Sequence, residues 1–268
     1  MTALSSISLP RVTARLLIRC EEGARAQGVG RLVADSSATR IVAVNIGCGT
    51  SPCLRPGWEN LDKALNARLR NLPRLRRSLG ALRLLPGSQD PWPKNLRIHD
   101  VRKGLPYEDN CLLYIYSSHT FEHLYPDQAR RFLGESLRVL KPGGVLRLAV
   151  PDLELLIQQY THARQGRGEK AREELPADAF VRQLLMVRES APRGIVDRWL
   201  KPILGKHTIH CWAYDWQSLR ARFLEAGFTN VRRCSHLESS IPDIEFLDLA
   251  EKKDESLYVE GIKPTAAL

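Results

Sequence analysis

The chain has 268 residues, of which 43% are hydrophobic and 26% are charged, and its formal net charge is +10. This length can bury a full core, and the composition is that of a soluble globular protein, which excludes a fibrous or largely disordered chain. We find no run of about 18 unbroken apolar residues, which argues against a membrane-spanning helix. Arginines interrupt the apolar positions among residues 1–20, so no secretory signal is predicted. Six cysteines without a C-x-x-C pair are typical of reduced thiols, and we expect a cytoplasmic protein.

The predicted elements alternate between strand and helix. We expect residues 1–39 to form an N-terminal extension, helical or partly disordered, and residues 40–268 to form a single domain. Its first strand is a β-branched run at 41–46 that stops at Gly47, a pattern typical of a buried parallel strand. Later strands are predicted at 59–62, 96–100, 112–117, 145–150, 229–234 and 256–261, and amphipathic helices at 127–140 and 215–228, the first capped by Asp127 and the second by Asp215. The alternation predicts an α/β fold with a mostly parallel sheet covered on both faces, with a helical insertion at 152–204.

A basic insertion is predicted at 66–93. Arginines cluster in residues 68–77, where leucines recur at near-helical spacing. The segment is interpreted as the solvated face of a helix or as a surface for an anionic partner such as a nucleic acid, a phosphorylated substrate or a lipid.

Chemistry-bearing residues follow the first three strands. Gly47 and Gly49 allow a tight turn and let a ligand lie against the backbone. The third glycine of the dinucleotide fingerprint is missing, which favours a nucleoside over a pyrophosphate. Asp62 ends the second strand and can accept both hydroxyls of a ribose, and Asp100 ends the third and can accept the exocyclic amine of adenine. Either aspartate can instead cap a helix or turn.

A family resemblance rests on several stretches taken in order. The sequence resembles a class I S-adenosylmethionine-dependent methyltransferase of the type 11 kind, in a poorly characterised bacterial branch, over about residues 40–263. The stretches that carry the resemblance are V44–G49, G57–D62, D100–Y107, Y116–L124, E135–G144, L148–D152, H210–D215, E225–F228 and S256–K263. It implies a doubly wound, Rossmann-like methyltransferase fold with a seven-stranded sheet, whose last strand runs antiparallel between its neighbours.

The resemblance also implies a cofactor, S-adenosyl-L-methionine, and the residues that bind it. They are Asn45, Gly47, Cys48 and Gly49 near the methionine part, Asp62 at the ribose, Asp100 and Val101 beside adenine, and Ser117 and Ser118 facing the sulfonium. Only about ten residues separate the glycine loop from the second strand, so the crossover between them must be short and irregular.

The stretch S117–L124 contains His119, Glu122 and His123 in the order H-x-x-E-H. On a helix the two histidines could bind Zn²⁺, with the glutamate as general base of a metallopeptidase. The resemblance instead places this stretch beside the transferable methyl group without a metal, Pro126 prevents a long helix, and a third ligand is lacking in the local sequence. We therefore predict no metal, local hydrogen bonds for Glu122 and His123, and for His119 either general base catalysis with an imidazole of ordinary pKa or a role in ordering the loop.

The acceptor is expected near a second cluster that contains His207, His210 and Tyr214, with His210 and Tyr214 as the candidates for contact. Trp212 and Trp216 either stack on the acceptor or belong to the core. The D/N-P-P-Y/F stretch of base-methylating enzymes is absent after the fourth strand, so we expect methyl transfer to a hydroxyl of a small-molecule or glycan acceptor, which can be phosphorylated or lipid-linked. The alternatives are an RNA methyltransferase and a protein that binds S-adenosylmethionine without catalysis.

Overall fold

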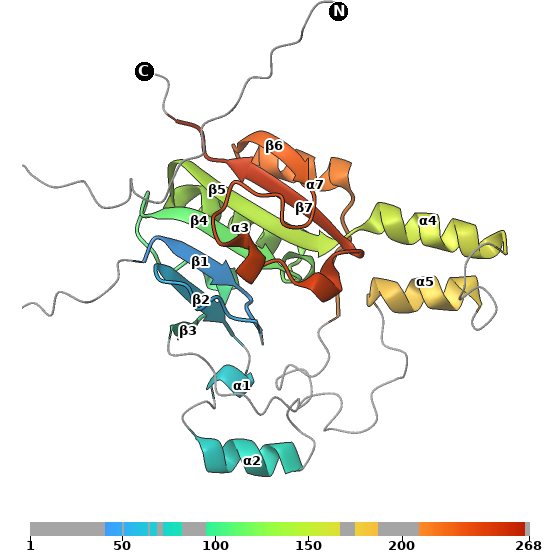
Figure 1. Cartoon of the computed structure of the whole chain (residues 1–268), viewed down its shortest axis with the longest axis horizontal. Helices are drawn as coiled ribbons and strands as arrows, with labels where there is room; N and C mark the ends of the chain where they lie inside the picture. The colour runs from blue at the N-terminus through green and yellow to red at the C-terminus, as the bar shows by residue number, and fades with distance from the viewer. Residues whose placement is uncertain are drawn as a thin grey trace, which may run out of the picture. The chain divides into compact units, whose positions relative to one another are not determined.

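The computed structural model describes residues 41–49, 51–63, 65–68, 72–81, 95–166, 175–186 and 209–265 (Figure 1). They all belong to Thr39–Leu268, the second of the two units into which the chain divides. The predicted extension at 1–39, much of the basic insertion and His207 lie outside the described residues. Within the described residues, no helix is long and apolar enough to cross a membrane, and five cysteines are free thiols.

The core is a seven-stranded sheet in the order β3-β2-β1-β4-β5-β7-β6. β1 to β5 pair in parallel, and β7 runs antiparallel between β5 and β6, which confirms the predicted topology (Figure 1). The strands are β1 Ala43–Ile46, β2 Trp58–Asp62, β3 Leu96–Ile98, β4 Leu112–Ser118, β5 Leu140–Pro151, β6 Thr229–Cys234 and β7 Ser256–Ile262.

β1 is central and fully buried, because its apolar side chains face helices or loops on both sides of the sheet. Its carboxyl end lies between those of β2 and β4, where ligands bind in open parallel sheets. The crossover from β1 to β2 contains no helix among its described residues, as the sequence predicted.

Two helices follow their predicted positions. α3, Pro126–Val139, begins with Pro126 in its first turn and has Tyr125 as N-cap, so the prediction of Asp127 as the cap was wrong by two positions. α7, Trp216–Glu225, begins at the predicted cap, where the Asp215 carboxylate accepts from the Ser218 backbone N–H at 2.7 Å. The other helices are α1 Leu65–Arg68, α2 Pro73–Ala81, α4 Leu153–Arg164, α5 Pro176–Leu184 and the 3₁₀ turns Val101–Lys103, Phe121–His123, Ile244–Phe246 and Ala250–Lys252.

The predicted insertion at 152–204 contributes α4 and α5 to the described residues. They lie side by side (Figure 1), and Tyr160 packs on Phe180 with ring centroids 5.2 Å apart. Asp152 caps α4 by accepting from the Glu154 backbone N–H at 3.0 Å. α4 therefore starts directly at the carboxyl end of β5, beside the predicted site.

A buried ionic cluster fastens the segment before β7 to the sheet. Arg147 on β5 is fully buried and donates to Asp248 at 2.6 Å and to Glu260 on β7 at 3.1 Å. Its guanidinium also lies over the Tyr258 ring, 4.8 Å from the centroid. The cluster fixes the start of residues 249–255, which form one wall of the site described below.

Candidate functional site

The two glycines after β1 meet different surroundings. Both have positive φ, +70° at Gly47 and +51° at Gly49. A Cβ on Gly47 would overlap the Thr120 side chain, whereas a Cβ on Gly49 would have nothing within 4 Å. Gly47 thus allows the loop after β1 to touch the loop after β4, and Gly49 leaves open space for a ligand.

Asp62, at the end of β2, lies directly beside this loop. Its Oδ2 accepts from the Gly49 backbone N–H at 2.9 Å. The carboxylate predicted to hold a ribose and the glycine loop predicted to hold the methionine part are therefore brought together.

Asp100 lies after β3 and caps the 3₁₀ turn that contains Val101. Its Oδ1 accepts from the Arg102 backbone N–H at 3.1 Å and from Arg102 Nε at 2.9 Å. The side-chain hydrogen bond from Arg102 lowers the pKa of Asp100 to about 2. The turn-capping role that the sequence left open is thus present, and the carboxylate is ionised at neutral pH.

Three of the predicted cofactor residues are turned into the protein. Asn45 Nδ2 donates to Asn60 Oδ1 at 3.1 Å, Ser117 Oγ donates to the Ile46 carbonyl at 3.2 Å, and Cys48 is 6% exposed. Burial raises the pKa of the Cys48 thiol. These side chains stabilise the loop from within.

Sequence reasoning missed Asn60, which is fully buried on β2. Its side chain accepts from the Cys53 N–H at 2.8 Å and donates to the Cys53 carbonyl at 2.9 Å, so it holds the irregular crossover in place. A polar residue in the middle of a buried strand is the signal that could have found it.

Ser118 and His119 follow one another at the end of β4, where the chain turns. Thr120 Oγ1 donates to the Ser118 carbonyl at 3.1 Å. His119 has a φ of +46°, in the left-handed region that costs a non-glycine residue about 1 kcal/mol or more. Its Nε2 lies 2.8 Å from Ser256 Oγ on β7. Burial lowers the pKa of His119 to about 4, so the expectation of an unperturbed imidazole was wrong.

A pocket of about 720 Å³ opens at His119. Its wall combines apolar side chains of α4 with charges of both signs from α5 and from the segment before β7. The lining residues are His119, Glu122, His123, Pro151, Leu155, Leu156, Gln159, Arg182, Gln183, Leu185, His210, Glu251, Lys252, Asp254 and Glu255.

Glu122 lies at the bottom of this pocket and is 1% exposed. Neither of its carboxylate oxygens has a hydrogen-bond partner among the described residues, so the expectation of a local hydrogen bond was wrong for Glu122. Burial raises the pKa of Glu122 to about 8.

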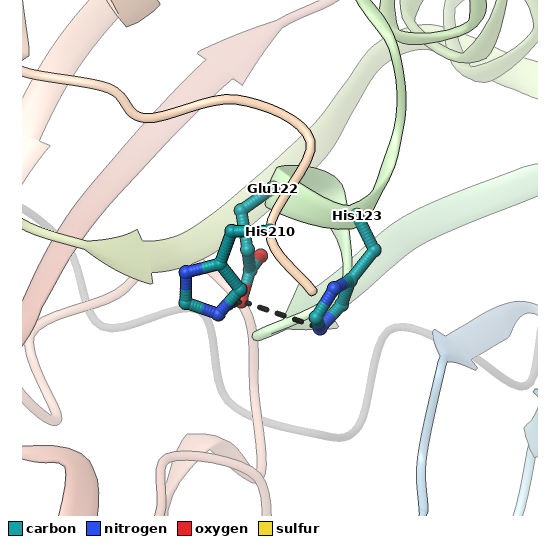
Figure 2. Close-up of side chains that lie close together, drawn as sticks. All are labelled: Glu122, His123 and His210. Atoms are coloured by element: carbon teal, nitrogen blue, oxygen red, sulfur yellow. Dashed lines mark ion pairs between the residues drawn. The ribbon is translucent and has the colours of Figure 1, made fainter. Parts of the chain in front are cut away.

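Three histidines surround the carboxylate at distances beyond hydrogen bonding. Glu122 Oε1 lies 3.6 Å from His119 Nδ1, 4.0 Å from His123 Nε2 and 3.9 Å from His210 Nε2. Figure 2 shows Glu122, His123 and His210 pointing toward one another. The Glu122 carbonyl accepts from the backbone N–H groups of Cys211 and Trp212, which brings the distant His210 to the cluster.

Tyr214 does not line the pocket, and the prediction that it touches the acceptor is not supported. It is 2% exposed and packs on Phe121 with ring centroids 5.1 Å apart. Burial raises its pKa, as expected for a core phenol. Trp212 is 43% exposed, and Trp216 packs against the core.

Residues 44–148 match the family model described as a methyltransferase domain. No curated protein matches the chain.

Solved structures with a similar fold share little sequence with the chain. A Haloferax volcanii complex that contains the Trm112 methyltransferase activator matches at 17% identity and a TM-score of 0.43, over 84% of this chain and 83% of that one. The Haemonchus contortus phosphoethanolamine N-methyltransferase 2 with S-adenosyl-L-methionine matches at 11% identity and a TM-score of 0.42, over 85% of this chain and 49% of that one. The S-adenosylmethionine-dependent methyltransferase SibL matches at 15% identity and a TM-score of 0.42, over 87% of this chain and 53% of that one. The chain thus spans about half the length of the last two proteins.

Proposed function

We propose that the protein, whose residues 44–148 match a methyltransferase domain, transfers the methyl group of S-adenosylmethionine to a hydroxyl of a polar small molecule or glycan bound in the pocket at His119. The observation that carries this proposal is the contact between Gly47 and Thr120. It brings the glycine loop against the turn in which His119, the residue before Thr120, lines the pocket, so donor and acceptor would meet across this turn.

The donor would lie along the carboxyl ends of β1 to β3. Asp62 would accept from the ribose hydroxyls, the open face of Gly49 would receive the methionine part, and Asp100 with Val101 would lie beside adenine. Ser118 would face the sulfonium. Asn45, Cys48 and Ser117 would act indirectly, by fixing the loop that the cofactor contacts.

The reaction needs alignment more than it needs protein chemistry, because the sulfonium is already electrophilic. The acceptor oxygen forms a bond to the methyl carbon, the carbon–sulfur bond breaks, and its electron pair returns to sulfur. His119, which its lowered pKa keeps neutral at pH 7, would act as a weak base for the proton that the hydroxyl loses.

The pocket chemistry suits an acceptor with several polar groups. Glu251, Asp254 and Glu255 can accept from hydroxyls, while Arg182 and Lys252 can pair with a phosphate. The leucines of α4 offer an apolar strip of the kind that the face of a sugar ring contacts.

Calorimetry with S-adenosylhomocysteine tests the donor half of the proposal. Asp62→Asn keeps the shape of the side chain but removes the charge, and a hydrogen bond to a charged group contributes about 1.5–3 kcal/mol, so we expect affinity to fall roughly 10- to 100-fold. Asp127→Asn, on the exposed start of α3, is the matched control and should bind like the parent. Absence of binding to the parent would overturn the proposal.

Labelled S-adenosylmethionine and a cell extract test the acceptor half. We expect a labelled product that survives nuclease treatment and alkaline demethylation of esters. A signal that nuclease removes would identify an RNA acceptor instead. Binding without any labelled product would mean that the protein binds the cofactor without catalysis.

A further inference from the structure

The Glu122 carboxylate needs a partner that the described residues do not supply. A buried carboxyl group without a hydrogen-bond partner has lost its hydration and has no direct hydrogen bond in its place, which is unfavourable. Both Glu122 oxygens are in this position at 1% exposure, although three imidazoles surround them. The arrangement is costly unless something binds between these groups.

The position of the proton on the His123 ring shows which nitrogen is available to a ligand. Its Nδ1 lies 3.0 Å from the Ile209 carbonyl oxygen, which can only accept, so Nδ1 carries the proton. In the neutral ring the Nε2 lone pair then faces the Glu122 carboxyl group at 4.0 Å, which is too far for a hydrogen bond. A cation between the two groups could bind both of them.

We propose that Glu122, His123 and His210 bind one divalent first-row transition-metal ion, such as Zn²⁺ or Mn²⁺, at the bottom of the pocket (Figure 2). Their ligand atoms, two imidazole nitrogens and one carboxylate oxygen, all lie within 4.8 Å of one another. An ion about 2.1 Å from each ligand needs them roughly 3.4 Å apart in a tetrahedral site. Glu122 Oε1 lies 3.9 Å from His210 Nε2 and 4.0 Å from His123 Nε2, and no two ligand atoms are more than 4.8 Å apart, so side-chain rotations would have to close each gap by about 1.4 Å or less.

The surroundings fit a metal site in two further respects. The hydrogen bond from His123 Nδ1 to a backbone carbonyl is the outer contact that orients metal-bound histidines. The backbone bonds from Cys211 and Trp212 to the Glu122 carbonyl hold His210 opposite Glu122, so two of the ligands are fixed relative to each other.

The ligand set also limits the ion. Two imidazoles and one carboxylate suit zinc, manganese, iron or cobalt, whereas Mg²⁺ and Ca²⁺ prefer sites made of oxygen ligands. Three protein ligands leave a coordination position open toward the pocket, as in catalytic rather than structural sites.

The role of the ion rests on the proposed function. In the pocket it would bind the acceptor hydroxyl, lower the pKa of that hydroxyl and hold the oxygen in line with the methyl group, while His119 receives the proton. The binding of the ion itself does not depend on this role.

Metal binding is measured on tag-free full-length protein. After treatment with a chelator, calorimetric titration with ZnCl₂ and MnCl₂ should show one saturable site per chain, and MgCl₂ should bind far more weakly. Glu122→Gln and His210→Gln should each weaken Zn²⁺ binding on the order of 100-fold, because each loses one of three ligands. His162→Ala, which removes an exposed histidine of α4, is the matched control and should bind like the parent.

Glu122→Gln also separates a lost ligand from a lost fold. A neutral amide of the same shape has a lower desolvation cost than the unpartnered carboxylate, so the metal-free variant should melt at the same temperature as the metal-free parent or higher. Added Zn²⁺ should raise the melting temperature of the parent but not that of the variant.

Two results would overturn the metal site: no saturable Zn²⁺ or Mn²⁺ binding by the parent, or unchanged binding by both variants. S-adenosylhomocysteine affinity, measured on the same samples, keeps the proposals apart. If the nucleoside binds and no metal does, only the metal site fails. If the metal binds and the nucleoside does not, the proposed function fails.

Discussion

Arg147 provides the sharpest test of how the pocket wall is held. Its guanidinium is fully buried, pairs with Asp248 and Glu260, and donates to the backbone carbonyls of Glu238 and Ser235 at 2.9 and 3.1 Å. Replacing it with methionine keeps a flexible apolar stem of similar length and removes the charge. Two carboxylates of which at most 2% is exposed then lose their buried counter-ion.

The expected loss of stability depends on the contacts that Asp248 and Glu260 keep in Arg147→Met. Asp248 keeps the Tyr116 hydroxyl at 3.1 Å and the Leu237 N–H at 2.9 Å, and Glu260 keeps Arg232 at 2.7 Å. These contacts hydrogen-bond the carboxylates without neutralising both of them. Breaking a buried ion pair costs about 3–5 kcal/mol, so we expect Arg147→Met to lower the free energy of unfolding by this amount. That loss corresponds to roughly 6–20 °C in melting temperature for a domain of this size.

The pH dependence identifies the cause. Burial alone would raise the pKa of Glu260, but hydrogen bonds from Ser239, Arg232 and the Ser240 backbone, together with the charge of Arg147, bring it below its ordinary value. In the parent, Glu260 therefore contributes stability that is present at neutral pH and is lost as the pH falls. In Arg147→Met we expect this pKa to rise, because the charge of Arg147 is lost while the hydrogen bonds from Ser239, Arg232 and Ser240 remain. Less of the stability from Glu260 is then left at neutral pH, so the difference between the two proteins should grow as the pH rises through these pKa values.

Urea unfolding of both proteins, followed by circular dichroism at several pH values, measures this difference. Arg222→Met, which breaks an exposed pair with Glu225 on α7, should cost less than about 1 kcal/mol and show little dependence on pH. A loss below about 1 kcal/mol for Arg147→Met, or a loss that is constant with pH, would refute the reasoning that buried charge pairing holds this segment.

Two further predictions concern the loops of the cofactor site. Gly47→Ala should cost about 1–3 kcal/mol in urea unfolding, because its Cβ would overlap Thr120, and Gly49→Ala should cost less, because nothing lies near its Cβ; equal costs would contradict the close approach. Arg102→Ala should raise the pKa of Asp100 from about 2 toward about 3.9, as measured by NMR titration. The variant should also lose the stability that the parent has at neutral pH and loses as the pH falls toward 2. An unchanged pKa would contradict the role of Arg102.

The positions of several strands and of the two amphipathic helices could be predicted because their signals are local, whereas the arrangement of the strands in the sheet came from the family resemblance. A β-branched run that ends at a glycine, an aspartate that ends the next strand and a capped amphipathic helix each need only a few neighbouring residues. Asp62 and Asp215 accordingly lie where the sequence placed them. The cap of α3 was misplaced because proline at the first helical position sets the start, whatever acidic residue follows it.

His119 and His210, which were predicted to lie on the acceptor side, both line the pocket, but the contacts between the pocket residues could not be predicted because they join distant segments. His210 meets Glu122 only because the chain at 209–212 returns across the turn after β4, and no local pattern encodes that return. Tyr214 follows His210 by four residues, yet it is buried among aromatic side chains of the core. Burial also sets the protonation of His119 and Glu122, and burial is a property of the folded chain.

The turn at residues 118–122 links the donor and acceptor sides of the site. Gly47 packs on Thr120, while His119 and Glu122, on either side of it, face the pocket. The left-handed backbone of His119 costs free energy, as it does at Leu185 and Leu237. The cost is understandable if the turn must present an imidazole to the acceptor at a fixed distance from the methyl donor, because an in-line transfer tolerates little error in the position of the attacking oxygen. Under the proposed function, the strain at His119 serves to hold the imidazole at a fixed place beside the methyl donor.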